Sequence, residues 1–279
     1  MRRAFLVLIV AWGSLGQTSP PLPSYARLEA NIPYDQHPQT MLDIVSPSGP
    51  AKERRPAVIA IHGGGWEQGS KEAFTEQVLP WVEKGFVAAN VDYRLLGVAL
   101  APAAAVDVLK AVEWFRKNGK RWNVDTGRIV LMGRSAGGYL ALIAGLGNKN
   151  SGIGSHHDMA AIVNFWGLTD MEDAITGPNP NPQALKWFPA EEQRGNLARR
   201  LSPMVYVRKD VPPVLTVHGS DDETVPYMHA VKLTKALRQA GADAEMISVP
   251  GGKHPVSDEL MKPVYPQIWE FLRRRGILK

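Results

Sequence analysis

Residues 131–138, LMGRSAGG, restrict the fold of this chain more than any other segment. Their G-x-S-x-G core follows an apolar run, 129–132, and precedes an apolar helical stretch, 139–146. This order predicts a strand, a tight turn and a helix, with glycines around Ser135 because a Cβ there would collide with the neighbouring strand and helix. Such a turn holds the serine hydroxyl out in a cleft, beside the free N–H groups of the helix N-terminus. A glycine-rich loop with an incidental serine is the alternative, so the choice depends on the rest of the chain.

The first residues have the pattern of a secretory signal peptide. Two arginines precede an apolar run, 4–12, and small residues follow. A short basic region, an apolar region of this length and small residues beyond it are typical of export, and the run is too short to span a bilayer comfortably. We expect residues 1–16 to be a signal peptide, residues 17–24 to be a proline-rich linker, and the protein to be secreted or periplasmic without stable membrane insertion. An uncleaved anchor is the alternative, because the small-residue site is weak.

Composition excludes several kinds of chemistry. The 279 residues contain no cysteine, which rules out disulfides, a thiolate nucleophile and thiolate metal sites. The formal charge of +5 falls to +3 without the two arginines of the signal segment, and no long basic run remains. We therefore expect no nucleic-acid partner.

Strand and helix patterns alternate along the chain. Strands are expected over 26–32, 41–45, 57–61, 86–91, 129–132, 161–165, 214–217 and 244–249, and further helices over 72–84, 102–118, 225–240 and 263–274. The first two strands are joined by a short turn-rich loop, and the later ones are spaced as parallel crossovers require. This predicts a three-layer α/β fold with a mostly parallel sheet, an antiparallel N-terminal start and helices on both faces.

The region 167–210 interrupts this alternation. It contains the run Gly-Pro-Asn-Pro-Asn-Pro and only short helical pieces, and it has too few apolar residues for a core of its own. Long irregular insertions in compact domains usually face a ligand. We expect a lid or substrate-facing insertion within a single domain over 25–279.

Three glycines, Gly63 to Gly65, follow the strand expected over 57–61. The carboxyl end of a parallel strand borders the ligand crevice of the sheet. Glycines there can turn backbone N–H groups toward a bound atom, as acyl transfer requires for the oxyanion of its tetrahedral intermediate. We expect Gly64 and Gly65 to donate, with Ala136 as a third donor. The alternatives are a phosphate-binding loop, although no P-loop lysine pattern follows, or a plain turn.

The acid and base that would activate Ser135 should follow it in that order. A strand runs into Asp221 and Asp222, where a carboxylate could hold an imidazole in one tautomer. Asp222 is preferred, and Asp221 is its rival. Of the seven histidines only His229 and His254 lie further along; the first is expected inside a helix, whereas His254 follows the last strand in a loop that could cross the crevice. The candidate triad is therefore Ser135, Asp222 and His254.

No metal and no organic cofactor are expected. The pair His156 and His157 with Asp158 could mimic a metal site, but adjacent histidines rarely ligate one metal. A surface loop is the preferred interpretation.

The candidate pocket walls are Trp66, Arg134, Tyr139, Trp166 and Trp187. The aromatic members could equally pack in the core.

Five segments together resemble secreted bacterial acetyl- and feruloyl-esterase-like (BD-FAE-like) proteins, serine esterases of the α/β-hydrolase superfamily with an HGGG oxyanion motif. The segments are 34–44 (YDQHPQTMLDI), 62–71 (HGGGWEQGSK), 92–95 (DYRL), 133–138 (GRSAGG) and 218–226 (HGSDDETVP). The resemblance implies deacylation of esters, often on plant polysaccharides, with a small-molecule or polysaccharide ester as substrate.

Two positions depart from the related patterns. Arg134 stands where members of the family often have Glu or Asp, and its charge beside the nucleophile is expected to alter acyl or leaving-group preference. Leu96 and Gly97 replace the Ala-Pro-Glu of the hormone-sensitive-lipase-like group, which argues against membership of that group.

Two other functions remain open on the same fold. An amidase or peptidase would use the same triad, because the same chemistry cleaves amides. A non-catalytic binding protein on a hydrolase scaffold would be expected to have lost part of the triad, and all three members are present.

Overall fold

The computed structural model describes residues 22–178, 180–190 and 194–279. The predicted signal peptide, residues 1–16, lies outside these ranges, as does most of the predicted linker, 17–24. Within them, no helix combines the length and the apolar character that crossing a membrane would require.

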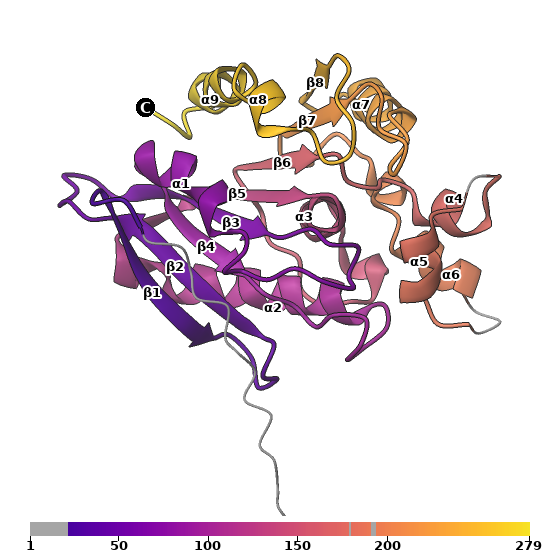
Figure 1. The fold of residues 1–279 in the computed structure, drawn as a ribbon, viewed down its shortest axis with the longest axis horizontal. Coiled ribbons are helices and arrows are strands. Elements are labelled where there is room, and N and C mark those ends of the chain that lie inside the picture. The colour runs from indigo at the N-terminus through magenta and orange to yellow at the C-terminus, as the bar shows by residue number, and fades with distance from the viewer. Residues whose placement is uncertain (1–21, 179, 191–193) are drawn as a thin grey trace, which may run out of the picture.

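One eight-stranded sheet, in the order β1-β2-β4-β3-β5-β6-β7-β8, forms the centre of the molecule (Figure 1). Its strands are β1 (Ala26–Pro33), β2 (Met41–Pro47), β3 (Arg55–Ile61), β4 (Val87–Val91), β5 (Val124–Arg134), β6 (Ala161–Phe165), β7 (Val214–Gly219) and β8 (Ala244–Val249). β2 pairs antiparallel with β1 and with β4, and all other neighbours pair in parallel. The predicted α/β fold, with a mostly parallel sheet and an antiparallel start, is confirmed.

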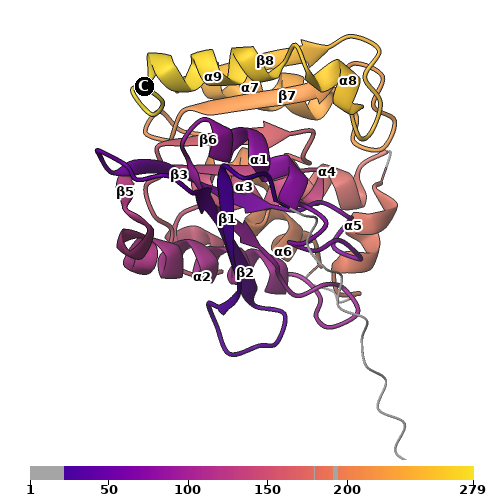
Figure 2. The same ribbon diagram turned by 60° about the vertical axis from the view of Figure 1, so that its left-hand side comes forward.

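Helices cover both faces of this sheet (Figure 2). They are α1 (Thr75–Glu83), α2 (Ala103–Asn118), α3 (Ala136–Leu146), α7 (Met228–Gln239), α8 (Asp258–Met261) and α9 (Tyr265–Arg274), with the short 3-10 helices η1 (Gly119–Trp122) and η2 (Lys149–Ser151) between them. Side chains of a strand alternate between faces. Val58 and Ala60 of β3 accordingly share a core cluster with α1 and α9, and Ile59 and Ile61 share one with α2, α3 and α7.

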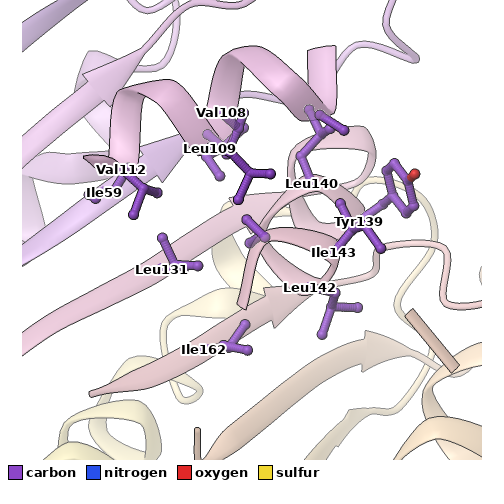
Figure 3. Close-up of a cluster of buried hydrophobic side chains, with 14 of the residues drawn as sticks. Ile59, Val108, Leu109, Val112, Leu131, Tyr139, Leu140, Leu142, Ile143 and Ile162 are labelled. Atoms are coloured by element: carbon purple, nitrogen blue, oxygen red, sulfur yellow. The ribbon is translucent and has the colours of Figure 1, made fainter. Parts of the chain in front are cut away.

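The helix after Ser135 is buried over its whole length. Every residue of α3 is buried, and its side chains pack between α2 and strands β3, β5 and β6 (Figure 3). A helix that is apolar on all sides belongs in a core of this kind. The turn at Ser135 is therefore held between two elements that cannot shift without disturbing the centre of the protein.

Element ends differ from the predicted ones at a few places. Each predicted strand occurs within two residues of its expected ends except β5, which begins five residues earlier. The helix predicted over 72–84 begins only at Thr75, and the residues before it form turns in which the Lys71 N–H donates to Asp92 Oδ1. The helix predicted over 225–240 begins at Met228, after a turn in which the Val225 N–H donates to Asp222 Oδ1.

The insertion, 167–210, contains α4 (Met171–Thr176), α5 (Pro182–Trp187), α6 (Arg194–Arg200) and η3 (Pro203–Tyr206). Its buried side chains, among them Ala184, Trp187 and Phe188, belong to the same core cluster as α2 and α3. In its described part the insertion is thus packed onto the main core and does not form a core of its own.

Candidate active site

Ser135 lies at the strained turn between β5 and α3. Its backbone angles, φ 54° and ψ −119°, are unusual for a residue with a Cβ. The turn is tight because glycines permit close approach: a Cβ on Gly137 would lie 2.1 Å from the carbonyl oxygen of Ile61. The hydroxyl projects from the carboxyl edge of the parallel strands, as the G-x-S-x-G pattern predicts.

The three predicted triad side chains form one hydrogen-bonded line. Ser135 Oγ lies 2.9 Å from His254 Nε2, and His254 Nδ1 lies 2.8 Å from Asp222 Oδ2. Asp222 comes from the loop after β7 and His254 from the loop after β8. The rival Asp221 is exposed and accepts from the Ser220 hydroxyl, so the structure does not bring it to the histidine.

The Asp222 carboxylate is buried and saturated with donors. Oδ1 accepts from the N–H groups of Thr224 at 2.9 Å and Val225 at 2.8 Å. Burial alone would raise the pKa of Asp222, but the hydrogen bonds from His218 and His254 and from the Val225 N–H outweigh it and hold the pKa well below its ordinary value. The carboxylate therefore stays ionised, as a group that orients and stabilises an imidazolium must.

His218 is a contact of this carboxylate that the sequence reasoning missed. It is fully buried at the end of β7, and its Nε2 lies 2.9 Å from the Val225 carbonyl oxygen and 3.2 Å from Asp222 Oδ2. Both neighbours are acceptors, so Nε2 carries the proton. The sequence feature that could have indicated this contact is that His218 stands four residues before Asp222, in the same segment at the end of a strand.

The glycine loop lies against the nucleophile. Gly64 and Gly65 have φ angles of 111° and 61°, in the region that favours glycine. A Cβ on Gly63 would be 3.3 Å from that of Ser135. Within the described residues the N–H groups of Gly64, Gly65 and Ala136 make no hydrogen bond, and all three residues line the same cavity as Ser135. Three backbone N–H donors without a partner in the described chain thus belong to residues that border the same cavity as Ser135.

A buried polar cluster around Lys71 connects the segment that contains this loop to the sheet. Lys71, only 2% exposed, places its Nζ 3.2 Å from Asp43 Oδ1 and also donates to Glu72 and to Asn31. Its backbone N–H donates to Asp92 at 2.6 Å. These contacts join the H-G-G-G-W-E-Q-G-S-K segment to β1, β2 and the end of β4.

His62 contacts the glycine loop directly. Its Nδ1 lies 2.7 Å from the Gly63 carbonyl oxygen, its ring stacks on Tyr93, and burial lowers its pKa to about 4. It is therefore neutral near pH 7 and acts as a fixed hydrogen-bond donor to the loop.

A cavity of about 470 Å³ opens over Ser135. Of the predicted walls, Trp66, Arg134 and Trp166 line it, whereas Tyr139 and Trp187 do not. The Trp187 ring stacks on Trp66 at 4.5 Å and that of Tyr139 meets Trp66 edge-on at 5.5 Å, so both lie behind the wall as packing. Of the two interpretations of the aromatic residues, the pocket wall therefore holds for Trp66 and Trp166, and packing in the core holds for Tyr139 and Trp187.

Several lining residues were not predicted. They include Phe74 and Gln77, near the start of α1, and Leu168, Asn181 and Gln183 of the insertion. The insertion thus contributes a wall of the cavity.

The histidine pair lies elsewhere. His156 Nδ1 lies 3.0 Å from the Ala144 carbonyl oxygen and its Nε2 2.9 Å from Ser151 Oγ, so its ring ties a loop to the end of α3. In the part of the chain that the structure describes, no group of three or more His, Cys, Asp or Glu side chains is arranged to hold a metal ion.

Comparisons with known proteins agree with this geometry. The family model BD-FAE matches residues 42–237. The esterases LipC and LipQ of Mycobacterium tuberculosis are 27% and 28% identical over 238 and 229 residues, which cover 79% and 78% of this chain. The chain spans only 58% and 54% of their lengths. A solved structure, a truncated form of a carbohydrate esterase from gut microbiota, superposes with a TM-score of 0.79 at 26% identity, covering 92% of this chain and 99% of that one.

Proposed function

Because this chain belongs to the BD-FAE family, we propose that it is a serine esterase that hydrolyses carboxylic esters through an acyl-enzyme intermediate. The observation that carries the proposal is the line from Ser135 Oγ to His254 to Asp222, with contacts of 2.9 and 2.8 Å. Each of the three residues follows a different strand of the sheet, so the fold itself brings the three side chains together.

The proton transfers follow from the hydrogen bonds. With Asp222 ionised, His254 keeps its proton on Nδ1, and Nε2 accepts the Ser135 proton as Oγ attacks the ester carbonyl carbon. His254 then donates that proton to the leaving alcohol as the C–O bond breaks. Water, deprotonated by the same nitrogen, attacks the acyl-enzyme and releases the acid and the free serine.

The negative charge that develops on the carbonyl oxygen needs fixed donors. The N–H groups of Gly64, Gly65 and Ala136 border the cavity beside Ser135 and have no other partner in the described chain. Removing one such donor typically raises a barrier by about 2.7–4 kcal/mol. The glycine loop is thus the proposed oxyanion hole.

We further propose that residues 1–16 are a signal peptide and that the enzyme acts outside the cytoplasm on short-acyl, acetyl or feruloyl esters, of small molecules or plant polysaccharides. The apolar run at 4–12 supports export. The similarity to a carbohydrate esterase supports polysaccharide esters as substrates. N-terminal sequencing of the exported protein would test the cleavage site.

A substrate panel tests the activity. p-Nitrophenyl acetate, acetylated xylan, methyl ferulate and a peptide anilide separate esterase from amidase action, and a fluorophosphonate should label Ser135 stoichiometrically. Ser135→Ala should lose both turnover and label, whereas Ser48→Ala, at an exposed position directly after β2, should retain both. Hydrolysis of the anilide alone would favour the amidase, and no hydrolysis or labelling would favour a binding protein.

A further inference from the structure

Arg134 places an arginine side chain in the cavity immediately before the nucleophile. It ends β5 on the face that carries α1 and α9, and it lines the cavity together with Ser135 and Phe74. Its Nη2 donates to the Tyr265 hydroxyl at 3.3 Å. Its guanidinium carbon also lies 5.5 to 6.0 Å from the ring centres of three aromatic side chains, namely Phe74, Phe165 and Trp166.

Among the described residues no carboxylate forms an ion pair with this cation, although the charge of Asp258 acts on it from a longer distance. Among the residues that the structure describes, no carboxylate oxygen lies within 4.0 Å of its nitrogens. Glu67 also lines the cavity, but it is already paired with Lys186 at 2.8 Å. Burial lowers the pKa of Arg134, since its charge is poorly solvated. A partly buried charge without a partner is unfavourable, and a ligand that supplies the partner removes that cost.

We propose that Arg134 is a specificity-determining residue that binds a carboxylate carried by the substrate close to its scissile ester. The inference rests on the proposed esterase function and names the substrate class of the same site: monoanionic esters. A carboxylate fits because the guanidinium is planar and offers paired donors in a fork. A dianionic group would leave one charge uncompensated, because Arg134 is the only lysine or arginine in the described lining of the cavity.

The position of Arg134 in the chain fits a carboxylate that lies close to the scissile ester. Arg134 and Ser135 are consecutive, so their Cα atoms are about 3.8 Å apart. Both residues also line the same cavity, so an ester whose carbonyl carbon is bonded to Ser135 Oγ has its nearby substituents within reach of the Arg134 side chain. The cavity, about 470 Å³, has room for an ester with a ring or a short chain between the two groups.

Matched substrates test the inference, each acid being compared with its neutral primary amide. 4-Acetoxybenzoate and 4-acetoxybenzamide carry the difference on the alcohol side, and monophenyl adipate and phenyl adipamate carry it on the acyl side. We expect kcat/KM of the wild-type enzyme to favour the acid by about tenfold or more in at least one pair, the effect of one charge-assisted hydrogen bond. The pair that responds identifies which half of the substrate faces Arg134.

Variants assign the preference to this side chain. Arg134→Gln should reduce the acid-to-amide ratio to about one, because kcat/KM falls more for the acids than for the amides, and Arg134→Lys should retain part of the ratio. The matched control is Lys117→Gln, which removes one exposed positive charge from α2, outside the cavity lining, and should leave the ratio unchanged. If Arg134→Gln does not fold, inhibition of the wild type by 4-hydroxybenzoate and by monomethyl adipate, against the corresponding amides, gives the same comparison.

Three results would overturn the inference. Equal rates and equal inhibition for acids and amides would overturn it while leaving the esterase function intact. An equal loss on acid and amide in Arg134→Gln would assign the arginine to packing against its aromatic neighbours. Failure of the wild type on every ester, p-nitrophenyl acetate included, would instead overturn the proposed function, and this inference with it.

Discussion

His218 Nε2 lies 3.2 Å from Asp222 Oδ2, the same oxygen that accepts the hydrogen bond of His254 Nδ1. The His218 ring is itself held by the Val225 carbonyl oxygen at 2.9 Å and meets the Tyr227 ring edge-on. A second histidine thus holds the carboxylate oxygen that orients the catalytic histidine. We interpret His218 as a positioning residue, which acts on the reaction only through Asp222.

Replacing His218 should therefore reduce kcat more than it changes KM. His218→Phe keeps a ring against Tyr227 but removes the donor, and loss of a hydrogen bond to a charged group, about 1.5–3 kcal/mol, corresponds to a decrease in kcat of about tenfold or more. His218→Gln, which retains an N–H group, should recover part of the rate. Steady-state kinetics on p-nitrophenyl acetate measure both. Unchanged kcat in a folded His218→Phe enzyme would exclude the positioning role.

The glycine loop should not tolerate a side chain at Gly64. Its φ is 111°, and an added Cβ would lie 2.0 Å from the Gln68 carbonyl oxygen, so the loop must move. Loss of one oxyanion donor lowers kcat by about 10²–10³. We expect Gly64→Ala to show this decrease, whereas Gly49→Ala, where nothing lies within 4 Å, should keep the wild-type kcat. A Gly64→Ala enzyme with wild-type kcat would show that this N–H is not used.

The residues that could be predicted from the sequence are those whose position depends on a strand end. Ser135, Asp222 and His254 each follow a strand of the parallel part of the sheet, and all carboxyl ends of parallel strands meet at one edge. Local patterns of apolar residues and glycines are sufficient to locate such ends. For this reason the sheet, its antiparallel start and the geometry of the triad could all be anticipated.

The cavity walls depend on packing between segments that are far apart in the chain. Local sequence patterns do not indicate which of these segments pack together. Tyr139 and Trp187, candidates for the wall, lie behind Trp66, because the wall is formed where the insertion meets the loop after β3. Gln183 was missed for the same reason: it reaches the cavity only because α5 packs on the main core. A tryptophan suits either environment, so its letter alone does not distinguish them.

The cluster around Lys71 should contribute strongly to stability. Asp43 is fully buried, and Lys71→Met would leave its carboxylate without the ammonium that balances it. Breaking a buried pair from one side costs about 3–5 kcal/mol, which urea unfolding can measure. The control is Lys117→Met, which removes an exposed i,i+4 pair with Glu113 and should cost less than about 1 kcal/mol. Equal losses in the two variants would contradict the importance of the buried cluster.

His229, whose Nδ1 accepts from the Thr169 N–H at 3.3 Å, should make a contribution to stability that falls on mild acidification. A protonated ring cannot accept, and burial, the main cause, lowers the pKa of His229 from 6.5 to about 4. Between these values the unfolded chain binds the proton and the folded chain does not. The contribution of this group to the free energy of unfolding should therefore decrease as pH falls from 6.5 to 4, by up to about 3 kcal/mol, and change no further below that range.

His229→Asn isolates this contribution, because an Asn Oδ1 can accept from Thr169 but does not titrate. In urea unfolding at several pH values between 4 and 7, the free energy of unfolding of this variant should rise relative to that of the wild type as pH falls. His62 and Asp92, whose pKa values burial shifts to about 4 and about 7, contribute equally to both proteins. His37→Asn, in the loop between β1 and β2, controls for the loss of one histidine. The difference should appear only between pH 4 and 6.5, since above that range neither the folded nor the unfolded ring is protonated. Parallel curves for the wild type and His229→Asn would mean that the ring protonates equally in the folded and unfolded chains, in conflict with its burial against Thr169.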